Sequence, residues 1–222
     1  MSRLAQNLQK IKESLRPNVQ LVAVSKTKPV ELLMEAYKQG QRIFGENKAM
    51  ELIEKAEQMP KDIEWHFIGH LQRNKVKALL PHTALIHGVD SPRLFWEIQK
   101  RALDFEKQQH IFLQVHIAEE STKFGFSEVE LVEFLKEIVS KDTSNIVVCG
   151  LMGMATFTED QEQVRREFKK LKSLFDNVQS SYFKSNPSFK DLSMGMSGDY
   201  LLAMEEGSTV VRIGSSIFGG RQ

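Results

Sequence analysis

The chain has 222 residues, with 30 basic and 29 acidic side chains and a formal net charge of +1 at pH 7. This balance gives no general electrostatic case for binding nucleic acid or an anionic membrane. No apolar run approaches the roughly 18 residues of a membrane-spanning helix, and the N-terminus lacks the apolar region of a signal peptide. The single cysteine, Cys149, cannot form an internal disulfide, so we expect a cytoplasmic protein.

The first segments of the chain predict a helix, a buried strand and a lysine at the end of that strand. Apolar residues recur at helical spacing over residues 2–15. Residues 21–24 form an apolar run that is typical of a strand buried on both faces, as in a parallel sheet. Lys26 follows at the carboxyl end of this strand, where α/β folds bind ligands. A partly desolvated lysine there can act as a nucleophile, although an ordinary exposed lysine is the alternative.

The alternation of strand and helix continues to the end of the chain. Eight strands are predicted, over residues 21–24, 42–45, 65–69, 84–87, 111–117, 145–151, 191–194 and 209–213. Three helix starts are predicted from capping signals, at Ser91-Pro92, at the capping box Ser127/Glu130 and at the capping box Thr158/Gln161. Residues 179–190 are polar and are predicted to form a surface loop. The count predicts one (β/α)8 barrel domain over residues 1–222, with an extra N-terminal helix, and an open doubly wound sheet is the main alternative.

Two loops rich in glycine and serine follow the last two predicted strands. Residues 194–199 (Met-Gly-Met-Ser-Gly-Asp) follow the seventh strand, and residues 212–220 follow the eighth. Barrels often hold a phosphate with these two loops, because glycine backbone amides, serine hydroxyls and a helix N-terminus all suit an anion. Either loop alone could be an ordinary turn. Together with Lys26 they describe a Schiff-base lysine and a phosphate cup, which are the two requirements of pyridoxal 5′-phosphate.

Six stretches of the chain resemble the pyridoxal phosphate homeostasis proteins. They are residues 23–27 (Ala-Val-Ser-Lys-Thr), 44–47 (Phe-Gly-Glu-Asn), 65–75, 150–152, 192–197 and 211–214. They stand in the right order and extend over nearly the whole chain. The resemblance implies a single-domain (β/α)8 TIM barrel of the alanine racemase N-terminal type (PLP fold type III), with pyridoxal 5′-phosphate held as an internal aldimine.

The resemblance also implies which side chains bind the cofactor, and it implies no catalytic residue. Lys26 matches the aldimine lysine, and Arg212 matches the arginine that faces the pyridine nitrogen. The phosphate-binding positions are matched by Ser197, Gly214 and Ser215. Asn47 matches a residue on the ring side of the pocket. Apart from the resemblance, Met196 lies near a strand end and is expected to pack around the pocket. Two positions depart from the family pattern, because Ser215 stands where threonine is also common and Lys123 follows Thr122 in a segment that often reads Glu-Ser-Lys.

Arg212 has a chemical consequence within this resemblance. A guanidinium does not release its proton, so it donates to the pyridine nitrogen, and the unprotonated ring is then a weaker electron sink. Racemases of the related fold overcome this with a tyrosine from a further C-terminal domain, which we do not expect in this chain. Its tyrosines fall in predicted helices or in the surface loop, at Tyr37, Tyr182 and Tyr200. We therefore expect a monomeric, non-catalytic carrier that serves vitamin B6 and amino-acid homeostasis, with PLP-dependent apoenzymes as recipients.

Two enzyme alternatives stay open, a weak PLP-dependent amino-acid racemase and a Schiff-base aldolase that acts on a phosphosugar through Lys26. His66 and His70 have the spacing of zinc ligands on a helix, but their segment is predicted to be strand and turn without a carboxylate or cysteine cluster nearby. No metal site is predicted. His87 and His116, at predicted strand ends, are expected to line the pocket or to be hydrogen-bonded.

Overall fold

The computed structural model describes residues 2–119 and 124–220, and over these residues the predicted strands close into a parallel barrel. The strands are β1 Gln20–Val24, β2 Ile43–Glu46, β3 Glu64–Phe67, β4 Leu85–Val89, β5 Gln109–Gln114, β6 Ile146–Met152, β7 Asp191–Met196 and β8 Val210–Ile213. They follow one another around the barrel in chain order, and β8 closes it by pairing in parallel with β1. The structure confirms the predicted (β/α)8 barrel and excludes the open sheet.

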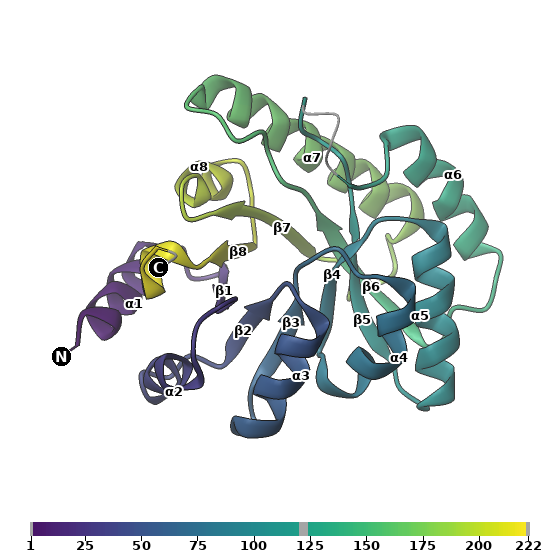
Figure 1. Cartoon of the computed structure of the whole chain (residues 1–222). Coiled ribbons are helices and arrows are strands. Elements are labelled where there is room, and N and C mark those ends of the chain that lie inside the picture. The colour runs from purple at the N-terminus through teal and green to yellow at the C-terminus, as the bar shows by residue number, and fades with distance from the viewer. Residues whose placement is uncertain (1, 120–123, 221–222) are drawn as a thin grey trace.

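Helices connect the strands and lie outside the barrel (Figure 1). The α-helices are α1 Arg3–Ser14, α2 Val30–Lys38, α3 Ala49–Gln58, α4 Val76–Leu79, α5 Pro92–Asp104, α6 Glu128–Val139, α7 Gln161–Tyr182, α8 Tyr200–Glu205 and α9 Ser215–Phe218, and the 3-10 helices are η1 Arg73–Lys75 and η2 Leu80–His82. None of the helices within residues 2–119 and 124–220 combines the length and the apolar character that crossing a membrane requires.

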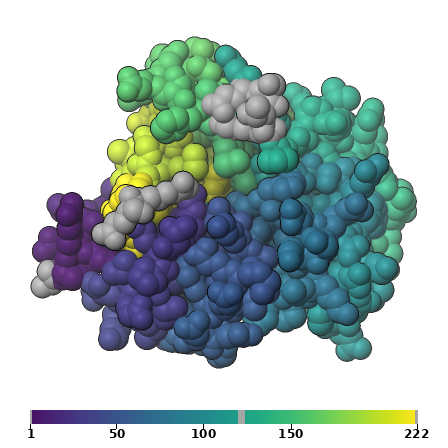
Figure 2. All heavy atoms as spheres, viewed as in Figure 1, coloured from purple at the N-terminus to yellow at the C-terminus, as the bar shows by residue number. Residues whose placement is uncertain are grey.

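The expected extra helix at the N-terminus is α1, and it packs beside the last helix of the chain. The side-chain amide of Asn7 donates to the backbone carbonyl of Ile217 in α9, with a nitrogen–oxygen distance of 3.3 Å. Figure 2 shows the purple N-terminal segment and the yellow C-terminal segment side by side. This contact ties the segment after β8 to the segment before β1.

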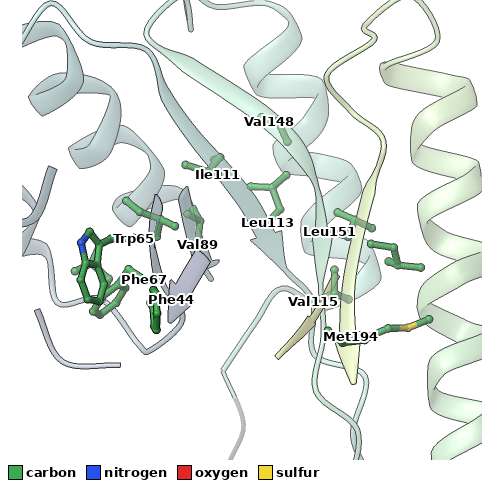
Figure 3. Close-up of a cluster of buried hydrophobic side chains, with 14 of the residues drawn as sticks. Phe44, Trp65, Phe67, Val89, Ile111, Leu113, Val115, Val148, Leu151 and Met194 are labelled. Carbon is green, nitrogen blue, oxygen red and sulfur yellow. The ribbon is translucent and has the colours of Figure 1, made fainter. Parts of the chain in front are cut away.

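Side chains alternate between the two faces of the barrel wall, because successive residues of a strand point to opposite sides. On β3, Trp65 and Phe67 pack in the main hydrophobic core, between the strands and the helices. His66 lies between them in the chain and is hydrogen-bonded inside the barrel to His87 of β4. Figure 3 shows part of the core around Trp65 and Phe67. On β3, therefore, the bulky apolar side chains point outward to the helices and the polar side chain points into the barrel.

The inside of the barrel is apolar at one level and polar at the next. The apolar level consists of buried side chains from five strands, Val22, Leu85, Phe112, Cys149, Met152 and Val210. On three of these strands a buried polar residue follows two positions later, with His87 after Leu85, Gln114 after Phe112 and Arg212 after Val210. Because all the strands run the same way, this polar level faces the carboxyl-end mouth of the barrel.

Two local predictions are wrong, and each has a physical reason. The N-cap of α7 is Asp160, whose carboxylate accepts from the backbone amides of Glu162 and Gln163, so the predicted box at Thr158 and Gln161 does not form. Thr158 instead accepts from the backbone amide of Asp160, at 3.1 Å. The carboxylate is the nearer cap and prevails. The capping box of α6, with Ser127 and Glu130, is confirmed.

The predicted surface loop at residues 179–190 is also wrong in part. Helix α7 continues to Tyr182, and Phe189 is only 1% exposed. The ring of Phe183 stacks on that of Phe189 with 4.4 Å between centroids. Two phenylalanines therefore anchor a segment whose polar composition alone favours a loop.

Candidate functional site

A cavity of about 850 Å³ lies at the carboxyl-end mouth of the barrel. Its walls come from the loops that follow β1, β2, β3, β7 and β8, together with the segments after β5 and β6. The structure brings all seven sequence-predicted cofactor-binding residues to this cavity, namely Lys26, Asn47, Met196, Ser197, Arg212, Gly214 and Ser215. They are far apart in the chain, and they meet because parallel strands end at the same edge of the barrel.

Lys26 lies in a tight turn that begins where β1 ends. The turn is fixed by the backbone amide of Ser25, which donates to the carbonyl of Gly45, and by that of Lys28, which donates to the carbonyl of Ser25, both at 3.0 Å. Thr27 has a φ of +64°, which is rare for a β-branched residue. Lys26 itself is half-buried. The turn thus holds a primary amine at the cavity wall.

Arg212 projects from β8 into the base of the cavity and is 4% exposed. One guanidinium nitrogen, Nη1, donates to the hydroxyl of Ser193 at 2.6 Å, and Nη2 donates to the carbonyl of Gly153 at 3.1 Å. Burial lowers the pKa of Arg212 to about 10, against a smaller opposing effect of Asp199. At neutral pH the base of the cavity therefore carries a fixed, protonated donor.

A chain of hydrogen bonds continues from Arg212 through the polar level of the barrel. The hydroxyl of Ser193 lies 3.1 Å from His87 Nδ1, and His87 Nε2 lies 3.0 Å from His66 Nδ1. A guanidinium only donates, so the Ser193 hydroxyl accepts from Arg212. The two imidazoles extend this chain from Ser193 to His66.

Burial keeps both histidines neutral at physiological pH. It lowers the pKa of His66 to about 3, and it lowers the pKa of His87 well below its ordinary value, with further contributions from His66 and Arg212. The hydrogen-bonded Ser193, His87 and His66 therefore orient Arg212 without adding another positive charge near it.

The loops after β7 and β8 are joined at the cavity by a direct hydrogen bond. The backbone amide of Gly214 donates to the hydroxyl of Ser197 at 3.2 Å. Ser215 is the first residue of α9, and the first amides of a helix have no acceptor within it. Hydroxyls and backbone amides thus converge on one wall of the cavity, as an anion such as a phosphate requires.

Sequence reasoning missed a second polar pair at the mouth, His70 with Asp90. His70 Nδ1 lies 2.8 Å from Asp90 Oδ2, and the imidazole stacks on the ring of Phe124 with 4.1 Å between centroids. His70 and Phe124 both line the cavity. His70 follows β3 and Asp90 follows β4, so the two residues meet only when these strands pair in the barrel. No local sequence pattern predicts such a contact.

Sequence reasoning also missed a buried ion pair between Glu46 and Lys55, with Nζ and Oε1 2.8 Å apart. The sequence offered one signal, because Glu46 belongs to the motif at residues 44–47. Among the described residues, no group of three or more His, Cys, Asp and Glu side chains is arranged to hold a metal ion. Lys123 lies outside the described residues.

Comparisons with known proteins point to one family. The family model described as "Alanine racemase, N-terminal domain" matches residues 1–222. The pyridoxal phosphate homeostasis protein of Aquifex aeolicus is 39% identical over 226 residues, which cover 100% of this chain and 97% of that protein. Its namesake in Homo sapiens is 38% identical over 212 residues, covering 90% of this chain and 76% of that protein.

A solved structure extends the likeness to three dimensions. PipY of Synechococcus elongatus PCC7942, with PLP bound, is 32% identical and superimposes with a TM-score of 0.89. The match covers 98% of this chain and 100% of that one.

Proposed function

Because the chain belongs to the pyridoxal phosphate homeostasis proteins, within the alanine racemase N-terminal domain family, we propose that it binds pyridoxal 5′-phosphate and serves PLP and amino-acid homeostasis. One observation carries the proposal for this chain. A half-buried amine, a buried guanidinium and a hydroxyl–amide wall surround the same cavity, at Lys26, Arg212 and Ser197–Gly214. These groups match the aldehyde, the ring nitrogen and the phosphate of the cofactor.

Each predicted residue has a distinct role in this proposal. Lys26 would supply the primary amine that reacts with the aldehyde of the cofactor. Arg212 would donate to the pyridine nitrogen, while the hydroxyls and amides at Ser197, Gly214 and Ser215 would hold the phosphate. Asn47 and Met196 line the sides of the cavity. The fit is supported by the donor set, because every charged or protonated partner that the cofactor requires is present.

The proposed role is carriage of the cofactor, without catalysis. Bound pyridoxal phosphate supplies an electron-accepting ring, and it accepts electrons best when its nitrogen is protonated. Arg212 holds its own proton, so it favours the unprotonated ring. The tyrosines do not line the cavity, and the hydroxyls of Tyr37 and Tyr200 are hydrogen-bonded to Asp62 and Ser14. We propose a monomeric cytoplasmic carrier with PLP-dependent apoenzymes as recipients.

Borohydride trapping tests the proposal directly. Purified protein mixed with pyridoxal phosphate is expected to turn yellow, and borohydride is expected to bleach the colour by reducing the C=N bond to a stable amine. Peptide mass analysis should then place the label on Lys26, and Lys26→Ala should abolish trapping. A label that persists on the Lys26→Ala protein at wild-type yield would overturn the assignment of this lysine.

The same preparation decides between the carrier and the enzyme alternatives. The alanine racemase domain favours weak amino-acid racemase activity as the second candidate. A carrier yields no D-amino acid when the loaded protein is incubated with L-alanine or other L-amino acids, whereas sustained D-enantiomer formation supports the racemase. A colourless protein with aldol turnover on a phosphosugar would support the aldolase.

A further inference from the structure

Three charged side chains, two of them buried and one partly exposed, form a group beside the turn that carries Lys26. Glu46 ends β2 and its side chain is fully buried, while Lys55 comes from α3 with its side chain 7% exposed. The ammonium of Lys55 lies 2.8 Å from Glu46 Oε1 and 2.7 Å from Glu51 Oε1. We call Glu46, Glu51 and Lys55 the clamp.

Burying these charges is costly, so the clamp needs a reason beyond packing. Ion pairs in a protein interior lose solvation that their mutual attraction does not always restore. Glu46 Oε2 is buried without a hydrogen-bond partner among the described residues. Burial accordingly raises the pKa of Glu46, against the opposing effects of Lys55 and Ser25. An apolar trio would fill the same space at lower cost.

The clamp contacts the backbone on both sides of Lys26. On the N-terminal side, Lys55 Nζ donates to the carbonyl of Ser25 at 2.9 Å, and the Ser25 hydroxyl donates to Glu46 Oε1 at 2.6 Å. On the C-terminal side, the backbone amide of Thr27 donates to Glu51 Oε1 at 2.6 Å. The two residues that flank Lys26 are therefore held by one connected set of charges.

The contacts of the clamp account for the unusual backbone conformation of Thr27. A β-branched residue with a φ of +64° persists only where its surroundings fix it. The bond from the Thr27 amide to Glu51 supplies such a constraint. It reverses the chain immediately after Lys26, so the directions of the next side chains depend on it.

A second lysine near Lys26 could compete with it for the same aldehyde. Lys28 lines the same cavity, two residues further along the turn. Its ammonium donates to the carbonyl of Gly220 at 2.8 Å, across the C-terminal segment. Two amines thus lie at one cavity wall, and both belong to the turn that the clamp contacts.

We propose that the clamp of Glu46, Glu51 and Lys55 positions Lys26, and not Lys28, for covalent reaction with the cofactor aldehyde. The clamp residues do not line the cavity, so they act through the turn and touch no reacting atom. The inference rests on the proposed function, because it concerns the same lysine and the same ligand.

The test compares Glu51→Gln and Lys55→Met with the control Glu97→Gln. Glu51 is 21% exposed, so its variant is expected to fold even if the Lys55 variant does not. The control removes an ion pair of the same i,i+4 spacing and a similar length, 2.7 Å to Arg101, from α5 and away from the cavity. Apo protein is mixed with pyridoxal phosphate, quenched with borohydride at successive times and digested.

A positioning role predicts two changes in the clamp variants. The rate of label formation at Lys26 should fall by about tenfold or more, because small displacements of a reacting group are strongly penalised. The share of label on Lys28 should rise. Affinity for pyridoxine 5′-phosphate, which lacks the aldehyde, should stay within about twofold of wild type, since 0.4 kcal/mol corresponds to a factor of two. The control should match wild type in all three.

The outcomes separate this inference from the proposed function. If wild-type protein forms no label with pyridoxal phosphate, the proposed function fails. If wild type is labelled at Lys26 and Glu51→Gln has the same rate and the same lysine selectivity, the clamp proposal is overturned. If affinity for pyridoxine 5′-phosphate falls as much as the rate of labelling by pyridoxal phosphate, the role is general stabilisation and the proposal is likewise overturned.

Discussion

Gly214 lies against the end of β1, and its lack of a side chain matters there. A Cβ at this position would come within 2.9 Å of the carbonyl oxygen of Val24 and 3.1 Å of its Cβ. The first contact is with backbone, which cannot swing aside as a side chain can. The same residue donates its amide to the Ser197 hydroxyl, so any retreat from β1 moves the wall that we propose to hold the phosphate.

Gly214→Ala is therefore predicted to weaken binding of pyridoxal phosphate by about tenfold or more and to destabilise the fold by about 1–3 kcal/mol, the usual cost of overpacking. Both effects are measured on purified protein, by titration with the cofactor and by urea unfolding. Gly198→Ala is the control, because it lines the same cavity and a Cβ there meets nothing within 4 Å. Equal affinities for the two variants would contradict the prediction.

Much of the site could be predicted at the level of single residues, but its supports could not. Lys26 follows an apolar run, and Gly214 follows another, so each could be predicted from its neighbours in the sequence. The partner of Glu46 is nine positions away on a different element, and that of His70 is twenty positions away. Hydrogen bonds of this kind depend on how segments that are distant in the chain meet around the closed barrel, which periodicity does not encode.

At the scale of elements, the hydrogen-bond chain from Arg212 to His66 ties four strands together inside the barrel. Its members come from β8, β7, β4 and β3, and each contributes one inward side chain. Ser193 is the central link, because its hydroxyl accepts from the Arg212 guanidinium and lies 3.1 Å from His87 Nδ1. Without it, two buried polar groups each lose one partner at once.

Ser193→Ala is predicted to destabilise the protein by about 1–3 kcal/mol, the cost of leaving buried polar groups unpaired. It should also shift the absorption spectrum of the bound cofactor, because Arg212 loses the contact that orients it. Ser208→Ala is the matched control. Ser208 is 3% exposed and its hydroxyl donates to the carbonyl of Met194, so its loss should lower stability without moving the spectrum. Identical spectra for wild type and Ser193→Ala would refute the orienting role.

The elements themselves were largely predictable, and the errors fall where two local signals compete. Every strand was located to within a few residues, most directly at β1 and β6, because strands buried on both faces consist mainly of apolar residues. At the start of α7, Thr158 and Asp160 both offer a cap, and the stronger acceptor prevails. At the end of α7, polar composition outweighed the two phenylalanines in the prediction, whereas the stacking of Phe183 on Phe189 decides the structure.

At the scale of the whole molecule, closure of the barrel forms the site and also makes the stability of the protein sensitive to acid. Closure brings the carboxyl ends of β1 and β8 together, which places Lys26 near the loop of Gly214. It also buries His66 and His87 in an interior that solvent does not reach. The folded protein therefore keeps two imidazoles neutral at pH values at which the unfolded chain protonates them.

Stability is predicted to fall as the pH drops below about 6.5, the ordinary pKa of histidine. Burial lowers the pKa of His66 to about 3 in the folded protein, and the pKa of His87 is also lowered. Between these values the unfolded chain binds protons that the folded chain does not, so the free energy of unfolding decreases with falling pH. The slope is about 1.4 kcal/mol per pH unit for each such group.

For His66 alone this amounts to about 2 kcal/mol between pH 7 and pH 5. Urea unfolding at the two pH values measures it, and His66→Gln should lose about that much less than wild type. The comparison isolates the imidazole, because the carboxylates, Glu46 included, titrate in both proteins. His110→Gln, on an exposed position of β5, should keep the wild-type slope. A His66→Gln protein with the same pH dependence as wild type would show that the buried histidine does not control acid stability.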